Sequence, residues 1–346
     1  MRDLLGTSRA RLVTALTAFL STATVSAGQD APPPVEPSYP IVSIGALTFV
    51  QYVVDAQDPE HFNAFDLTRG YININADLNP RVSVRLTPDI RRAVGGPLDG
   101  SLVIRLKYGY VDFDGPSAGS WIRAGLQQTP WLDFEEAINR YRVEGQMFAE
   151  REGLIPGSAD FGLGYFGVFG RQRLEVQAGV YNGEGFGRGE VDHGKSVQGR
   201  VTVRPFRGRL VGLRLTAFGD WGGSGIGPAR RHAIGMVSYE SPRAVLILQG
   251  LRSTRPVTGV AVDSTGVSGF VEIRRSLVGP AAFARVEQLR ADDGGARRRA
   301  IAGVAYWLQW DRVRLGLVTS FLDARSTLAA TQPRERQLAA LIHIQF

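Results

Sequence analysis

The stretch Leu102-Val103-Ile104-Arg105-Leu106-Lys107-Tyr108-Gly109-Tyr110 decides the fold class of this chain. Apolar or aromatic side chains occupy every second position, and the positions between them hold Val103, Arg105, Lys107 and Gly109. Successive side chains of a β-strand point to opposite faces. The stretch therefore predicts a strand with one apolar face, which includes Tyr108 and Tyr110, and one mostly polar face.

The same alternation recurs along the rest of the chain, with Arg, Glu, Gln or Thr at many of the intervening positions. We find about sixteen such segments, which suit tilted strands that cross a bilayer. No apolar run of about 18 residues follows the N-terminal segment, so the sequence predicts no membrane-spanning helix. Clear examples are Val82–Leu86, Ile122–Leu126, Leu174–Ala178, Val201–Val203, Val313–Leu317 and Leu338–Phe346.

The connections between these segments alternate between short and long. The short ones are Asn79-Pro80, 114–119, Gly170, 205–208, Ser241-Pro242, 278–280 and Trp310-Asp311. The long ones are 55–63, 91–100, 128–158, 182–195, 220–228, 252–262, 291–297 and 323–333. This order predicts an all-β fold: a transmembrane antiparallel β-barrel with long extracellular loops and short periplasmic turns.

A soluble β-sandwich is the main alternative architecture, and it requires a dry interior between two sheets. The polar face of the predicted strands carries Arg or Glu on nearly every strand, and unpaired charges are costly in a packed core. A water-filled lumen accommodates them. We therefore expect the polar faces to line a lumen and the apolar faces to contact lipid.

The last strand supports closure of the barrel. Leu338, Ala340, Ile342, Ile344 and Phe346 alternate with polar and small residues up to the final residue of the sequence. An unpaired strand of this length would be an aggregation-prone edge, and pairing with the first strand removes it. A terminal strand ending in an aromatic residue also resembles the signal that delivers outer-membrane barrels to their assembly machinery.

The N-terminal residues 1–27 have the layout of a cleaved signal peptide. Arg2, Arg9 and Arg11 precede the apolar stretch 12–25, and Val25-Ser26-Ala27 fits a cleavage site. Residues 28–40 form a Pro-rich periplasmic lead, and 41–346 the barrel domain. We expect export to the outer membrane of a Gram-negative bacterium.

The composition excludes several chemistries. The chain has no Cys, so it has no disulfide, cysteine nucleophile or thiolate metal site, and its four His are too scattered for a metal motif. We expect no enzyme activity, no cofactor and no metal. The formal net charge of +7 comes almost wholly from Arg, since Lys107 and Lys195 are the only lysines. On the predicted lumen face it points to small anionic solutes and not to nucleic acid.

Two Gly-rich matches to nucleotide-binding motifs are attributed to chance. The stretch 189–196 fits the phosphate-loop pattern, but the alternating stretch 197–202 that follows predicts a strand where that motif requires a helix. The stretch 162–167 fits a dinucleotide fingerprint and likewise opens no helix. Its glycines suit a barrel strand.

The third long connection, 128–158, differs from the others. Phe134, Ala137, Ile138 and Tyr141 fall at helical spacing, and Asp133 with Glu136 resembles a helix cap. We expect a short amphipathic helix that folds inward and narrows the channel. The alternatives are a surface lid or a subunit contact.

Several segments together resemble the phosphate-selective porin O/P family. They are 65–73, 106–112, 123–131, 158–162, 180–183 and 195–205, so the resemblance is clearest in the N-terminal half. It implies a sixteen-stranded outer-membrane channel, usually a homotrimer, with an inward-folded third loop and a basic lumen that favours anions. The lysine cluster expected of that family cannot be carried over beyond Lys107.

The predicted site combines strand cations with the third loop. Arg85, Arg105, Lys107 and Arg123 project from three consecutive strands and would form a ladder of cations along the lumen. The loop opposite is acidic overall, and its candidate constriction residues are Asp133, Glu135, Glu136, Arg140 and Arg142. The combination predicts passive diffusion of small hydrophilic solutes with a modest anion preference, phosphate included, and no tight phosphate site. A non-conducting structural or adhesive barrel is the alternative, and a barrel enzyme is disfavoured for lack of a nucleophile–base pair.

Overall fold

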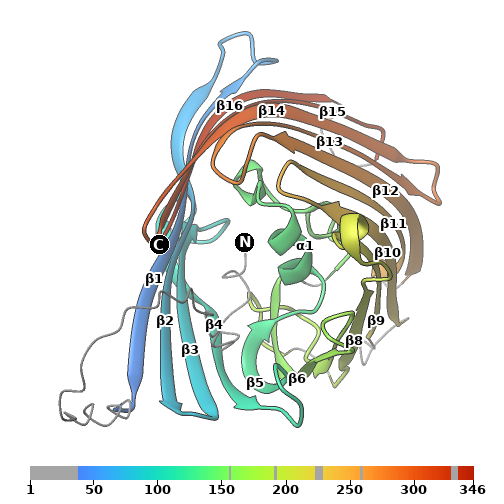
Figure 1. Ribbon diagram of the computed structural model, residues 1–346. Coiled ribbons are helices and arrows are strands. Elements are labelled where there is room, and N and C mark those ends of the chain that lie inside the picture. Colours follow the sequence, from blue (N-terminus) through green and yellow to red (C-terminus); the bar gives the residue numbers. More distant parts are fainter. Residues whose placement is uncertain (1–37, 156, 191–192, 223–228, 258–259, 329–333) are drawn as a thin grey trace, which may run out of the picture.

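The computed structural model describes residues 38–346 apart from 156, 191–192, 223–228, 258–259 and 329–333. The predicted signal peptide and most of the Pro-rich lead lie outside the described residues. Sixteen antiparallel strands form one closed barrel in which each strand pairs with its sequence neighbours and β1 pairs with β16 (Figure 1). The predicted fold class is confirmed.

The strands are long and their bounds follow the predicted alternation. They are β1 Ile41–Asp55, β2 Asn63–Asn79, β3 Val82–Arg92, β4 Leu102–Asp114, β5 Trp121–Gln128, β6 Ala159–Phe169, β7 Leu174–Tyr181, β8 Ser196–Val203, β9 Leu213–Gly222, β10 Arg230–Glu240, β11 Ala244–Val257, β12 Val260–Arg274, β13 Gly279–Ala291, β14 Ala296–Trp310, β15 Val313–Ser326 and β16 Arg334–Gln345. The helical segments are α1 Leu132–Ile138, α2 Phe148–Arg151 and the 3-10 turns η1 Arg142–Glu144 and η2 Gly208–Leu210. Among the described residues, no helix is long and apolar enough to cross a membrane.

Closure of the barrel uses the last residues of the chain. Leu47 lies opposite Gln345 in the β1–β16 ladder, and the backbone N–H groups of Ala46 and Phe346 each donate to the other residue's carbonyl at 3.0 Å. The predicted pairing of the first and last strands is therefore confirmed, and it leaves no open sheet edge.

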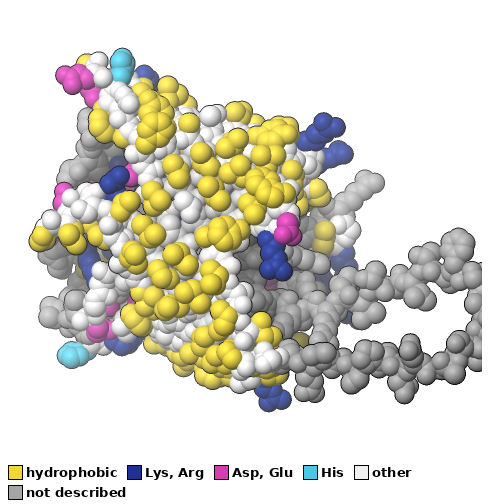
Figure 2. Space-filling view, turned by 90° about the vertical axis from the view of Figure 1, so that its left-hand side faces the viewer, with side chains coloured by type: hydrophobic (Ala, Val, Ile, Leu, Met, Phe, Trp, Pro, Cys, Tyr) yellow, Lys and Arg dark blue, Asp and Glu magenta, His cyan; other side chains and the backbone are white. Residues whose placement is uncertain are grey.

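The outer face of the barrel is a band of exposed apolar side chains. Figure 2 shows these side chains spread across one face of the molecule, with most charged groups near its two margins. On β4 the outward residues Leu102, Ile104 and Leu106 are all exposed, as the alternation predicts. Both ends of the band carry exposed aromatic rings: Phe65, Phe161, Trp221 and Phe321 toward the long connections, and Phe113, Phe169, Tyr306 and Trp310 toward the short ones.

One predicted long loop is instead mostly strand. The connection placed at 252–262 is occupied by the ends of β11 and β12, which pair as far as Val257 opposite Val260. The polar residues Arg252, Thr254 and Asp263 there read as loop, but they interact across the two strands: Thr254 Oγ1 donates to Asp263 Oδ1 at 2.6 Å. Strand pairing satisfies the backbone groups of this segment, so a polar stretch is strand where the sequence predicted a loop.

Candidate functional site

The connection between β5 and β6, residues 129–158, enters the barrel and is called the inner loop here. Figure 1 shows α1 inside the ring of strands. Of the residues predicted at helical spacing, Phe134, Ile138 and Tyr141 are buried and Ala137 is half-buried, and Tyr141 lies beyond the end of α1. The expected cap is wrong: Trp131 occupies the N-cap position, and no side chain caps the helix. Packing of its apolar face therefore holds this two-turn helix in place.

The inner loop packs on an apolar surface that lines half of the barrel interior. We call this surface the apolar wall. It is formed by the inward side chains Phe218, Ile234, Met236, Ile247, Phe270, Phe283, Ile301, Trp307, Val318, Leu322 and Leu341, from β9 to β16. Charged side chains such as Glu272, Arg285 and Glu287 also point inward here, as expected, but apolar side chains share the inner face with them. The sequence prediction did not include these inward apolar residues, which pack against the loop.

Close approach between loop and wall is visible at two points. The Tyr141 ring stacks on Phe283 with centroids 3.9 Å apart, and Trp307 meets Tyr141 edge-on at 5.9 Å. On β12, a Cβ added to Gly266 would lie 2.7 Å from the Phe148 ring, so glycine there makes room for α2. The loop therefore packs against the apolar wall as closely as the elements of a domain core pack against one another.

Buried ion pairs join the same two surfaces. Glu272 on β12 is almost fully buried and accepts hydrogen bonds from Arg140 Nε at 2.8 Å and Tyr141 Oη at 2.9 Å. Its other oxygen accepts from Arg274 Nη1 at 2.8 Å. Arg151 of α2 pairs in the same way with Glu287 of β13. Buried charges are tolerated only when they are paired and hydrogen-bonded, so these contacts fix the position of the loop.

The opposite side of the inner loop carries a charge cluster that faces β2. Arg142 Nε lies 2.6 Å from Glu136 Oε1, Arg142 Nη2 lies 2.7 Å from Glu150 Oε2, and Arg69 of β2 lies 3.6 Å from Glu136. Burial raises the pKa of Glu136, but Arg142 and Arg69 outweigh it and hold the pKa below its ordinary value. Glu136 is therefore a charged group in the barrel interior.

Arginines and tyrosines alternate on a second part of the barrel interior, from β2 to β5. We call Arg69, Tyr71, Arg85, Tyr108, Tyr110 and Arg123 the Arg–Tyr wall. The guanidinium of Arg69 lies 4.8 Å from the Tyr71 ring centroid, that of Arg85 lies 4.9 Å from Tyr108, and that of Arg123 lies 3.9 Å from Tyr110. Cation–π contacts of this kind hold extended arginines in fixed positions.

The placement of Tyr108 and Tyr110 corrects a sequence prediction. Alternation put both rings on the lipid side, but both are buried on the lumen side. The cause is a β-bulge: Pro88 pairs with Leu106 while Thr87 pairs with Tyr108, so Lys107 is an extra residue in β4. A bulge of one residue moves every later side chain to the other face.

The four predicted strand cations all lie on the lumen side, but they differ in their partners. Arg105 pairs with Asp89 at 3.0 Å, and Arg123 pairs with Asp112 at 2.6 Å. Arg85 donates to Asn73 Oδ1 at 2.7 Å and to Thr87 Oγ1 at 3.0 Å, and it has no ion-pair partner among the described residues. The ladder of four therefore includes two cations that acidic neighbours neutralise.

The fourth cation, Lys107, is covered. Only 2% of the residue is exposed, since its amine contacts Ser158 and lies 3.6 Å from the ring centroid of Phe186. Phe186 belongs to the connection after β7, so a second long connection also reaches inward. The sequence signal for this contact is Phe186, the single aromatic residue of a Gly-rich connection, and the sequence prediction did not include it. Arg69 and Tyr71 were also missed, although Arg69-Gly70-Tyr71 alternates in the same way as β4.

The five predicted loop residues are divided between the two sides of the inner loop. Glu136 and Arg142 belong to the cluster that faces the Arg–Tyr wall. Asp133 has a raised pKa because of burial, against the opposing effect of Arg123 and Arg85 on that wall. Glu135 and Arg140 contact the other side: Trp131 Nε1 donates to Glu135 at 2.9 Å, and Arg140 binds Glu272.

A serine, an aspartate and a histidine meet in the barrel interior in an order that does not suit nucleophilic catalysis. Ser196 contacts Asp220 directly, and His232 Nε2 lies 3.6 Å from the same carboxylate. Catalysis of the serine-hydrolase type requires the imidazole between the hydroxyl and the acid. Ser196 also begins β8, so the phosphate-loop match is followed by a strand.

Comparison with known proteins relates the chain to a set of solved barrels. No family model and no curated protein matches the sequence. An anion-selective porin from Comamonas acidovorans superposes with a TM-score of 0.66 at 11% identity, over 89% of this chain and 100% of that one. A loop-deletion mutant of OmpT, an outer-membrane protein of Vibrio cholerae, gives 0.62 at 12% identity over 89% and 100%. OmpF of Salmonella typhi in complex with daunomycin gives 0.59 at 13% identity over 88% and 97%. At this level of identity the likeness shows the fold: a sixteen-stranded barrel of the outer-membrane porin type.

Proposed function

We propose that this chain is an outer-membrane porin through which small hydrophilic solutes diffuse passively, with a modest preference for anions such as phosphate. The observation that carries the proposal is Arg85. It lies on the lumen side without an ion-pair partner in the described part of the chain, on the side of the inner loop away from the apolar wall. A fixed cation on a low-dielectric wall favours anions in the passage beside it.

The transverse arrangement of charge supports permeation of polar solutes in general. Glu136 of the inner loop and Arg69 of β2 form an ion pair at 3.6 Å, so acid and base are in contact where the loop meets β2, and the proposed passage runs beside this pair. Both are partly accessible. Asp89 and Asp112 reduce the positive excess of the Arg–Tyr wall, which is why we expect a modest selectivity and no tight phosphate site.

The exterior supports a membrane location. A closed barrel leaves no unpaired backbone edge in lipid, and the exposed apolar band has aromatic rings at both ends, as barrels of the outer membrane do. We place the protein in the outer membrane of a Gram-negative bacterium, with residues 1–27 removed on export and the short connections in the periplasm. The strand that ends at Phe346 is proposed to contact the barrel assembly machinery.

Membership of the phosphate-selective porin O/P family and assembly as a homotrimer are part of the same proposal. They rest on the sequence resemblance in the N-terminal half. Likenesses among the solved structures add support for the trimer, since one of them is a Vibrio cholerae OmpT in trimer form, at 12% identity and a TM-score of 0.60 over 89% of this chain and 99% of that one.

Reversal potentials test the proposal. The purified barrel is reconstituted in a planar bilayer under a KCl gradient, and we expect an anion-selective potential that falls in Arg85→Gln and is retained in the charge-preserving Arg85→Lys. Replacing chloride by phosphate should leave a measurable current without block. Cation preference in the wild type would overturn the anion assignment. Absence of stable open steps would favour the alternative, a non-conducting structural or adhesive barrel.

A further inference from the structure

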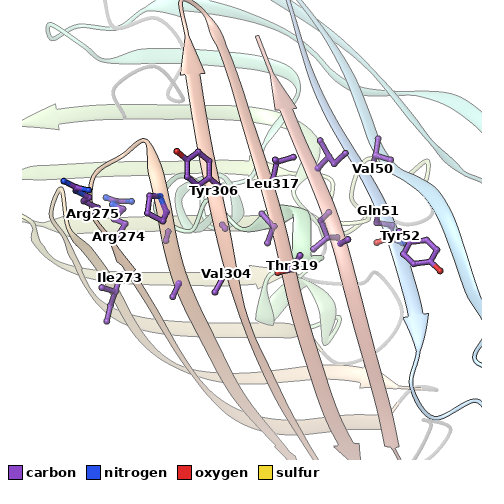
Figure 3. Close-up of a pocket in the computed structure, with 18 of the residues that line it drawn as sticks. Val50, Gln51, Tyr52, Ile273, Arg274, Arg275, Val304, Tyr306, Leu317 and Thr319 are labelled. Carbon is purple, nitrogen blue, oxygen red and sulfur yellow. The ribbon is translucent and has the colours of Figure 1, made fainter.

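The outside of the barrel carries a groove that the channel function does not use. It crosses β12 to β16 and β1, has a volume of about 830 Å³, and is shown in Figure 3. Its floor is a row of smaller side chains paired across neighbouring strands: Ala282 opposite Val304, Val304 opposite Thr319, and Thr319 opposite Ala340. Larger side chains border this row, including Tyr306, Leu317 and Ile342 on its short-turn side.

A cation lies at one end of this groove. Figure 3 places Arg275 at the end formed by the β12–β13 connection, with Val50 and Tyr52 at the other end. Arg275 is exposed and makes no ion pair with any described residue. The neighbouring Arg274 points inward to Glu272 and to the carbonyl of Ser241, so Arg275 is the guanidinium that remains available at the groove.

The whole short-connection end of the barrel shares this charge. Six of the seven short connections carry at least one arginine, against the single acidic residue Asp311. Acidic residues outnumber basic ones in the connections at the opposite end. An apolar groove that ends at a basic rim is complementary to a molecule with a hydrocarbon chain and an anionic head. The arginines of the short connections whose side chains are described are Arg81, Arg171, Arg173, Arg204, Arg207, Arg243, Arg275 and Arg312.

We propose that the groove over β12–β16 and β1 binds one acyl chain of an anionic phospholipid from the leaflet at the short-connection end, with the lipid phosphate at Arg275. The inference rests on the membrane location in the proposed function, because only a barrel in a bilayer meets this ligand. The rim arginines attract the headgroup, and the groove distinguishes this position from the rest of the apolar band.

Native mass spectrometry of the detergent-solubilised barrel tests the proposal. The protein is titrated with phosphatidylglycerol and with phosphatidylcholine of the same acyl chains. We expect tighter binding of phosphatidylglycerol, a loss of about fivefold in its affinity in Arg275→Gln, and loss of both lipids in the groove-filling Ala340→Trp. The matched controls lie on the far side of the barrel: Arg171→Gln on another short connection and Ala178→Trp on the outer face of β7, both expected to bind as the wild type does.

The outcomes separate this proposal from its competitors. Unchanged phosphatidylglycerol binding in both groove variants would overturn it. A groove covered by a second copy of the chain is indicated if Ala340→Trp changes the oligomeric state while lipid binding stays the same, which also overturns it. Ala282→Phe fills the same groove from a different strand if Ala340→Trp fails to fold.

Failure of the lipid site and failure of the channel assignment are distinguishable by conductance. Arg275 and Ala340 lie outside the lumen, so both variants should keep the wild-type conductance and reversal potential in a planar bilayer. A barrel that conducts normally but binds lipid identically in all variants contradicts only the lipid site. A barrel that binds phosphatidylglycerol through Arg275 but never opens contradicts only the porin assignment.

Discussion

Two regions of the barrel interior differ in what they contact. The apolar wall of β9 to β16 is covered by the inner loop, with Tyr141 stacked on Phe283 and Arg140 paired to Glu272. The Arg–Tyr wall of β2 to β5 contacts the loop mainly through charge, as where Arg69 meets Glu136. The apolar wall therefore behaves as a domain core, and the Arg–Tyr wall is the side on which the proposed passage lies.

The difference shows how the inner loop is held inside the barrel. The inner loop has one apolar side and one charged side. Ile138 and Tyr141 face the apolar wall, while Glu136 and Arg142 face the Arg–Tyr wall. Burial of its apolar side holds the charged side at a fixed distance from β2 and β3. We expect mutations on the two sides to have different consequences, stability on one side and selectivity on the other.

The largest effect is expected from breaking the buried charge network under the loop. Glu272→Ala leaves Arg140 and Arg274 without their shared carboxylate, and removal of one partner of a buried ion pair costs about 3–5 kcal/mol. The loop should detach from the apolar wall, which lowers the urea midpoint of unfolding in micelles and raises single-channel conductance.

Glu335→Ala is the matched control for this variant. Glu335 pairs with Arg299 at 3.7 Å at a partly exposed position, so its loss should change the unfolding free energy by less than about 1 kcal/mol. Equal destabilisation by the two substitutions would show that the loop is not anchored through Glu272.

The sequence predicts the barrel well and the division of its interior poorly. Strand alternation, the order of short and long connections and the terminal Phe346 are local signals, and the structure agrees with them. The face of Tyr108 depends on how β3 pairs with β4 at Thr87 and Pro88, which no single-strand pattern contains. Likewise, Phe283 faces inward because Tyr141, more than a hundred residues earlier, stacks on it. Contacts between segments far apart in sequence set both features.

A smaller effect is expected from pH, again on the packed side. Burial raises the pKa of Glu144 to about 7, against the hydrogen bond from Ser320 at 2.7 Å and the fields of Arg285 and Arg299. Burial likewise raises the pKa of Glu135 to about 7. Because both values lie above the ordinary 4.5, the packed loop favours the protonated acids.

The stabilisation from protonation is therefore complete below about pH 4.5 and is lost as pH rises through about 7. Hydrogen exchange of the inner-loop amides should be slower at pH 5 than at pH 8. Glu135→Gln combined with Glu144→Gln should remove that dependence after correction for intrinsic exchange, whereas Glu60→Gln, at an exposed carboxylate, should not. Protection that increases with pH in the wild type would contradict the burial of these two acids.

The smallest effect on stability is expected on the Arg–Tyr wall. Tyr108→Leu removes the aromatic ring beneath Arg85 but keeps an apolar side chain at this buried position, and a cation–π contact contributes about 0.5–2 kcal/mol. Arg85 keeps Asn73 and Thr87 as partners but loses its aromatic support, so we expect a lower anion preference and noisier open current with the inner loop still packed. Tyr108→Phe retains the ring and should behave as the wild type. If Tyr108→Leu lowers the urea midpoint as much as Glu272→Ala does, then the two walls do not divide stability and selectivity between them.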